Sequence, residues 1–148
     1  MAKLYVSSVI EAPVERVWQY IRDFNGLPKW FPGVTDSHIE EGKPGDHVGC
    51  VRNFGLEGGG RMREQMLALS DHEHFCTYRM LSTPVPLSFY QATVRLRRVT
   101  DGDRTFAELA SEFVSPPEQE SALAAFLSSA YQGSFELLKK HCGSGKSA

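Results

Sequence analysis

Arg52 and Glu64 are the two residues of this 148-residue chain whose types and surroundings could do chemistry. Alternation along an extended strand places Arg52 on the same face as Phe54. In the same way, Glu64 shares a face with Met62 and Met66. Because burying an unpaired charge among apolar side chains is unfavourable, we expect the two residues to pair or to face a wet pocket.

This pair is consistent with three roles. It could form a cross-strand salt bridge, anchor the polar part of a ligand, or act in general acid/base catalysis. Desolvation would raise the pKa of Glu64 toward neutrality, as proton transfer requires, whereas a close Arg52 would lower it again. The pattern of residues leaves all three roles open.

Tyr90 is a third candidate, because it shares a strand face with Ala92, Val94 and Leu96. A tyrosine among apolar neighbours needs a hydrogen-bond partner for its hydroxyl group. That partner is either another core residue or a ligand, and the sequence favours neither.

The strands and helices that position these residues are predicted from changes in the spacing of apolar residues along the chain. Leu4–Ile10 is rich in β-branched residues and predicts a strand, which Ala12-Pro13 ends. Apolar residues at helical spacing predict a helix over Val14–Arg22. Asn25-Gly26 ends this helix, and Leu27–Phe31 can form a second short one.

The middle of the chain has a period of two, and its end returns to a helical period. Antiparallel strands separated by Gly, Pro and Asp turns are predicted at Thr35–Glu41, His47–Phe54, Arg61–Leu69, His74–Leu81, Ser88–Val99 and Thr105–Val114. A long helix is predicted over Gln119–Cys142. One long helix against a curved seven-stranded sheet is an α+β architecture with room for a ligand.

Composition narrows the functional classes. Sixteen basic and eighteen acidic residues give a net charge of −2, too weak a field to attract nucleic acid or an anionic membrane. Three dispersed cysteines predict neither a disulfide framework nor a zinc site, and we expect no metal and no cofactor. Without a membrane span or a signal peptide, a cytoplasmic location is expected. Residues 1–142 are expected to form a single domain, followed by a disordered tail over 143–148.

The opening of the chain resembles the Bet v 1-like superfamily, which includes START domains and bacterial polyketide cyclase/dehydrase-type proteins. The resemblance rests on Ser8-x-x-Glu11-Ala12-Pro13-x-x-x-Val17-Trp18-x-x-Ile21-x-Asp23-Phe24, followed by Trp30. It extends over nearly the whole chain. It implies a helix-grip fold, in which a bent antiparallel sheet wraps around the C-terminal helix and encloses an apolar cavity.

A narrower resemblance is to lachrymatory factor synthases and abscisic-acid receptors. It rests on Arg52-Asn-Phe-Gly55-Leu56, Arg63-Glu64 and Leu87-Ser-Phe-Tyr90. The resemblance implies a gate loop at Phe54–Glu57 and a latch-like loop at Pro84–Leu87. It also implies cavity roles for Arg52, Glu64 and Tyr90, the types that the synthases use. The loop before Glu64 is shorter than in the plant proteins, and Thr35–Glu41 lacks the receptors' lysine, so we do not expect a hormone receptor.

The expected cavity is lined by residues from the gate, the strands and the long helix. They are Phe54, Leu56, Met62, Met66, Tyr78, Leu87, Phe126, Leu127, Ala130 and Tyr131. The leading hypothesis is binding of a small hydrophobic or amphipathic molecule, such as a lipid, an isoprenoid or an aromatic polyketide, by a monomer or weak homodimer.

Two alternatives remain beside binding. One is a cofactor-independent cyclase, dehydratase or isomerase, in which Glu64 moves a proton, Arg52 holds developing negative charge and Tyr90 orients the substrate. The other is a non-catalytic protein that docks a partner through the two loops at the mouth of the cavity.

Overall fold

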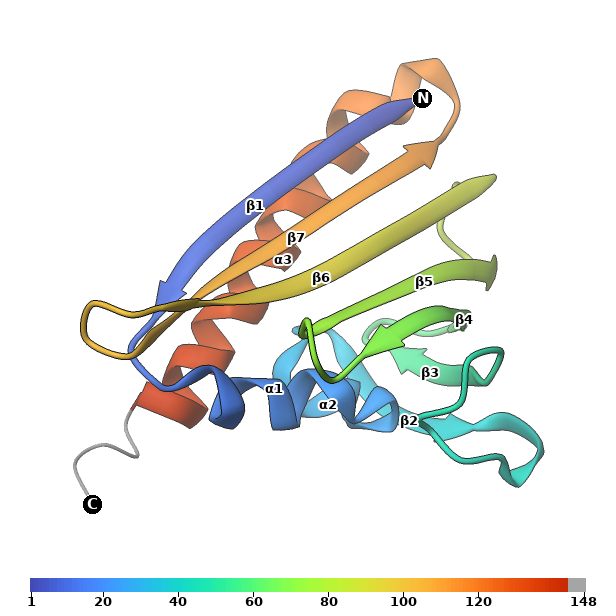
Figure 1. Cartoon of the computed structure of the whole chain (residues 1–148). Helices are drawn as coiled ribbons and strands as arrows, with labels where there is room; N and C mark the ends of the chain where they lie inside the picture. Colours follow the sequence, from blue (N-terminus) through green and yellow to red (C-terminus); the bar gives the residue numbers. More distant parts are fainter. Residues whose placement is uncertain (144–148) are drawn as a thin grey trace.

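The computed structural model describes residues 1–143, which form one antiparallel sheet of seven strands and a long C-terminal helix (Figure 1). The strand order is β1-β7-β6-β5-β4-β3-β2. Strands that follow each other in the chain are neighbours from β2 to β7, whereas β1 joins the sheet beside β7. The expected α+β helix-grip fold is confirmed. Apart from Gly143, the predicted tail lies outside the described residues.

The element bounds are as follows. The strands are β1 (Ala2–Ile10), β2 (Val34–Ile39), β3 (Val51–Leu56), β4 (Arg61–Ser70), β5 (Phe75–Ser82), β6 (Phe89–Val99) and β7 (Arg104–Val114). The α-helices are α1 (Val14–Arg22), α2 (Leu27–Trp30) and α3 (Glu120–Cys142). Single turns of 3-10 helix lie at η1 (Phe24–Gly26), η2 (Glu40–Gly42) and η3 (Pro117–Gln119).

Helix α1 forms where proline ends the first strand. Pro13 has the extended conformation of a helix-capping residue, and its ring does not interfere with a helix that starts after it. Val14, Val17, Trp18 and Ile21 are all buried on one stripe of the helix. Burial of that stripe, rather than intrinsic propensity, holds so short a helix in place.

The two halves of helix α3 differ in burial. Its 23 residues span about 35 Å, and it packs mainly on β1 with smaller contacts to β7 and α2. The buried residues lie in its C-terminal half: Tyr131, Ser134, Phe135, Leu138 and Cys142. The residues of its N-terminal half are half-buried or exposed, and Figure 1 shows the helix running behind β1 and β7.

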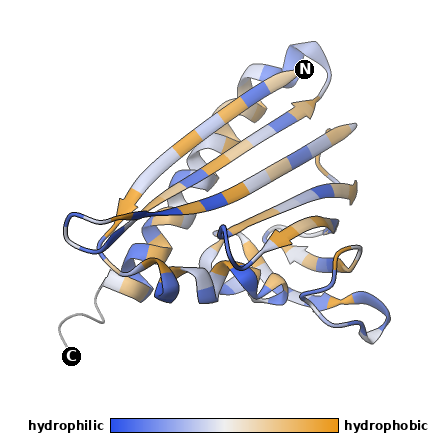
Figure 2. Cartoon of the chain, viewed as in Figure 1, coloured by the Kyte–Doolittle hydropathy of each residue, from blue (hydrophilic) through white to orange (hydrophobic). Residues whose placement is uncertain are grey.

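The longest strands alternate strictly between a buried and an exposed face. In β6, Tyr90, Ala92, Val94 and Leu96 are buried, and the alternate residues are more exposed. The same alternation appears as orange and blue bands along the strands in Figure 2. Ser111 is a polar exception on the buried face of β7, at 4% exposure.

The third strand starts later than the sequence predicts. A strand was expected from His47, but β3 begins at Val51, because the His47–Cys50 segment turns back on itself. The Cys50 amide donates to the His47 carbonyl, and Gly49 has φ of +97°, which extended L residues do not adopt. Val48 is consequently 63% exposed.

Most of the segment expected to form the gate loop, Phe54–Glu57, belongs to a strand. Phe54, Gly55 and Leu56 belong to β3, and the turn to β4 comprises only residues 57–60. The Leu56 amide bonds to the Gly60 carbonyl and closes the hairpin. Strands β3 and β4 stay paired up to Gly55 and Arg61, so the loop between them is a tight hairpin turn and not a long flap.

Candidate functional site

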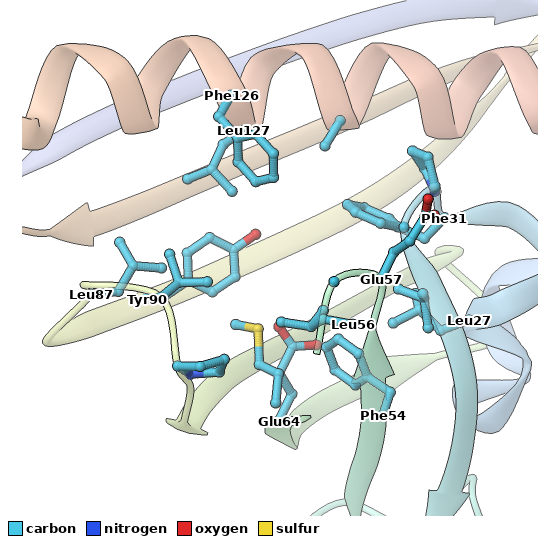
Figure 3. Close-up of a pocket in the computed structure, with 18 of the residues that line it drawn as sticks. Leu27, Phe31, Phe54, Leu56, Glu57, Glu64, Leu87, Tyr90, Phe126 and Leu127 are labelled. Carbon is cyan, nitrogen blue, oxygen red and sulfur yellow. The ribbon is translucent and has the colours of Figure 1, made fainter. Parts of the chain in front are cut away.

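A cavity of about 760 Å³ lies between the sheet and the N-terminal half of α3 (Figure 3). In Figure 3, Phe126 and Leu127 from α3 lie across the space from Glu64 and Phe54. The lining residues are Leu27, Phe31, Pro32, Gly33, Val34, Arg52, Phe54, Leu56, Glu57, Gly58, Gly59, Met62, Glu64, Tyr78, Pro84, Val85, Leu87, Tyr90, Phe126, Leu127 and Ala130. Most are apolar, as in pockets that bury small molecules.

Arg52 and Glu64 form a buried ion pair in the wall of this cavity. They lie opposite each other in the β3–β4 register and are 3% and 4% exposed. Arg52 Nε and Nη2 both donate to Glu64 Oε1, at 3.0 and 2.8 Å. The two donors of the planar guanidinium converge on one carboxylate oxygen, and both hydrogen bonds are strengthened by the opposite charges.

Two aromatic rings pack against the guanidinium of Arg52. Arg52 Cζ lies 4.0 Å from the centre of the Phe24 ring and 4.5 Å from that of Tyr78. Its remaining nitrogen, Nη1, donates to the Phe24 carbonyl at 3.3 Å. All three nitrogens of Arg52 therefore have protein acceptors, and the rings add cation–π attraction in a desolvated site.

Burial and pairing act on the pKa of Glu64 in opposite directions. Burial raises the pKa above its ordinary value, because it disfavours the carboxylate, and the Arg52 guanidinium opposes that rise. Arg52 stays protonated, since a guanidinium does not lose its proton in a protein. The pair thus places one positive and one negative charge in the wall with no net charge.

Three hydroxyl groups form a chain that starts at the cavity. Tyr90 and Tyr131 are joined by a 2.5 Å hydrogen bond, and the Tyr131 hydroxyl donates to Ser111 Oγ at 2.8 Å. Since the proton of Tyr131 goes to Ser111, Tyr90 is the donor to Tyr131. Burial raises the pKa of Tyr131 to about 12 and that of Tyr90 well above its usual value, so both phenols remain protonated.

The mouth of the cavity is framed by the β3–β4 hairpin, the β5–β6 loop and α3. Gly60 lies against Pro84, since a Cβ at Gly60 would come within 2.8 Å of the proline ring. The Glu57 amide donates to the Gly33 carbonyl at 2.8 Å and ties the hairpin to the loop before β2. Phe126 is 64% exposed at this rim.

The structure brings nearly all of the candidate residues to one cavity. Arg52, Glu64 and Tyr90 line it, together with every expected lining residue except Met66 and Tyr131. Met66 is buried in the core at 1% exposure, and Tyr131 is turned toward the sheet, where it reaches Ser111. Neither residue is part of the lining in this structure, although Tyr131 is hydrogen-bonded to Tyr90, which is. Ligand contact by either residue stays a prediction.

Sequence reasoning missed one wall of the cavity. Leu27, Phe31 and Val34, on and after α2, line it along with Pro32 and Gly33. Pro32 also packs against α3, because a Cβ at Gly133 would come within 3.1 Å of its ring. The Phe-Pro-Gly sequence signals a turn, but nothing in it indicates that this turn faces the long helix.

Residues 1–143 contain neither a candidate metal site nor a candidate membrane-spanning helix. No group of three or more His, Cys, Asp or Glu side chains in this part of the chain is arranged to hold a metal ion. None of its helices is long and apolar enough to cross a membrane.

A family model for polyketide cyclase, dehydrase and lipid transport proteins matches residues 1–143. The chain belongs to this family. The match confirms the polyketide cyclase/dehydrase branch that the opening motif indicates. It supports ligand binding or cyclase activity in general. No curated protein matches the chain in sequence.

Solved structures of family-like proteins superpose on nearly the whole chain. The protein XoxI from Bacillus cereus has 25% identity and a TM-score of 0.85, with 96% of each chain covered. A protein from Nitrosospira multiformis has 27% identity and a TM-score of 0.83, covering 99% of this chain and 100% of its own. The di-domain ARO/CYC protein BexL of the BE-7585A biosynthetic pathway has 11% identity and a TM-score of 0.76, and shares the fold over 95% of this chain and 46% of its own.

Proposed function

We propose that this protein binds a small hydrophobic or amphipathic molecule, such as a lipid, an isoprenoid or an aromatic polyketide, inside the cavity beneath α3. The observation that carries the proposal is the cavity itself, about 760 Å³ in volume and lined largely by apolar side chains. Interiors of ordinary domains hold few voids larger than a water molecule, so a space of this size needs a reason. The family's link to lipid transport agrees with it.

Native mass spectrometry of freshly purified protein tests the proposal. We expect an added mass that disappears on denaturation and identifies the ligand. Ala130→Trp narrows the cavity from α3 and should remove most of the bound mass. Ala125→Trp is the matched control, because Ala125 is an exposed residue of the same helix that does not line the cavity. Equal occupancy of the two variants would contradict binding at this site.

A second function, catalysis of proton transfer, is favoured by one specific observation. Glu64 and Tyr90 line the same cavity, and burial raises the pKa of Glu64 toward the range in which a carboxyl group can both give and take a proton. The pairing of Glu64 with Arg52 opposes this role, so binding remains the leading proposal.

Deuterium exchange separates binding from proton transfer. The ligand recovered from the protein is incubated with fresh protein in D₂O and analysed by mass spectrometry. If the protein is a catalyst, the wild type should incorporate deuterium at a carbon of the ligand at least 10²-fold faster than the Glu64→Gln variant. If the protein only binds the ligand, the ligand should stay unlabelled.

A further inference from the structure

Tyr78 presents an unpartnered hydroxyl group to the cavity. The residue lines the cavity and is 3% exposed, and its ring lies against the Arg52 guanidinium. No residue in 1–143 hydrogen-bonds to this hydroxyl. Among the same residues, the side-chain polar atoms sealed inside without a partner are Trp30 Nε1 and Ser37 Oγ. The Tyr78 hydroxyl is not one of them, so it opens onto the space of the cavity.

The second carboxylate oxygen of Glu64 is available in the same way. Both hydrogen bonds from Arg52 end on Oε1, and Oε2 has no donor within residues 1–143. Oε2 is also absent from the sealed atoms, so it too reaches the cavity. Figure 3 shows the Glu64 carboxyl group at the cavity surface, near Leu56 and Phe54.

Tyr78 and Glu64 are near enough to serve one ligand group. Glu64 lies opposite Met80 and Tyr78 lies opposite Met66 in the β4–β5 register, so the two are diagonal neighbours on one face. Diagonal neighbours have Cα atoms about 7–8 Å apart, within reach of long side chains. Burial raises the pKa of Tyr78 well above its usual value, so Tyr78 is a donor, while Glu64 Oε2 is an acceptor.

The cavity wall carries no net positive charge to balance an anionic ligand. Arg52 is the one basic residue among those that line the cavity, and the charge of Glu64, 2.8 Å away, already balances its own. Glu57, at the hairpin tip, is the other charged residue among those that line the cavity, and it is acidic. A carboxylate carries acceptors alone, and it would meet the Glu64 oxygen without a compensating charge.

We infer that the cavity selects ligands whose buried polar group is neutral and both donates and accepts, such as an alcohol or phenol hydroxyl, over carboxylates of equal length. The ligand hydroxyl accepts from Tyr78 and donates to Glu64. This inference rests on the proposed binding function and adds the chemistry of the ligand's polar end.

Displacement of the neutral fluorophore N-phenyl-1-naphthylamine by dodecan-1-ol and by dodecanoate at pH 8 tests it. We expect the alcohol to bind at least tenfold more tightly. Equal affinities, or tighter binding of dodecanoate, would overturn the inference and leave the proposed function intact. If neither the fluorophore nor the two ligands bind, the proposed function itself fails.

Two variants sharpen the test. Tyr78→Phe removes the donor and should reduce the alcohol's advantage at least fivefold, whereas Tyr5→Phe, an exposed residue outside the cavity, should leave it unchanged. Glu64→Gln leaves the charge of Arg52 unbalanced, so dodecanoate should gain at least tenfold and the order of the two ligands should reverse. An unchanged advantage in Tyr78→Phe would overturn the inference even if Glu64→Gln does not fold.

Discussion

Arg52 and Glu64 depend on each other more than on solvent, because both are almost completely buried. Removing one member of a buried pair leaves an uncompensated charge, which typically costs about 3–5 kcal/mol of stability. Arg52→Met should therefore lower the free energy of unfolding by about this amount in urea titrations. Removing both charges, in Arg52→Met/Glu64→Met, should cost less than the single change. An equal or larger cost in the double variant would show that packing, and not charge, dominates.

An exposed ion pair provides the comparison for that experiment. Arg61 and Asp36 are also joined, at 2.8 Å, but their side chains are 42% and 57% exposed. Arg61→Met should destabilise the fold much less than Arg52→Met does, since solvent screens the attraction.

Glu40, in the turn η2 after β2, predicts a pH dependence of the free energy of unfolding. Its hydrogen bonds with Arg63 lower its pKa to about 2 from 4.5. A depressed carboxyl pKa contributes stability above the unfolded value, and that contribution is lost as the pH falls through about 2. Because Arg63 is 39% exposed, we expect only about 1 kcal/mol at pH 7.

The variant Glu40→Gln isolates this contribution. Urea titrations of wild type and variant should differ by about 1 kcal/mol at neutral pH and converge as the pH falls from about 4.5 toward 2. A gap that does not change with pH would assign the effect to side-chain packing instead.

At the scale of elements, the contact between the β3–β4 hairpin and the β5–β6 loop can be measured with two glycines. Gly58 and Gly60 both have positive φ, at +92° and +88°, but only Gly60 lies against Pro84. Both alanine variants carry the backbone strain, and Gly60→Ala adds a clash. It should therefore destabilise the fold by about 1 kcal/mol more than Gly58→Ala. Equal losses in thermal unfolding would mean that the two loops do not support each other.

The same scale shows what sequence can and cannot predict. Helix α1 matches its predicted bounds because Val14, Val17, Trp18 and Ile21 repeat at one period, which burial then follows. The start of β3 was wrong by four residues, since alternation around Val48 continues through a turn that only the positive φ of Gly49 reveals. Local periodicity predicts which face a residue occupies, but not where a strand ends.

The placement of the candidate residues around one cavity follows from the same local pattern, whereas their roles stay predictions. Arg52 and Glu64 were placed on one face by alternation, and their opposite positions in the β3–β4 register followed from a short hairpin. The position of Tyr131 outside the lining could not be predicted, because its surroundings depend on where α3 lies along the sheet. The place of the helix is set by contacts such as Pro32 with Gly133, between segments about a hundred residues apart.

At the scale of the whole molecule, an open cavity couples stability to occupancy. A ligand that binds only the folded state stabilises it by about 2.7 kcal/mol at a hundredfold excess over its Kd. For a domain of this size, that corresponds to a rise in Tm of about 5–10 °C. Differential scanning calorimetry with dodecan-1-ol should show this rise, and Ala130→Trp should reduce it. If the Tm does not change at a saturating concentration of dodecan-1-ol, the ligand does not bind the native state.

The pairing of β1 with β7 has a consequence for synthesis on the ribosome. Ala2 lies beside Phe113 and Ile10 beside Thr105, so the first of the seven strands can pair only after the seventh has been synthesised. Contacts between such distant segments slow folding, because a long loop must close before they form. A nascent chain therefore carries β1 without its neighbour until β7 emerges, and α3, which is synthesised after both strands, then packs on β1 and closes the cavity.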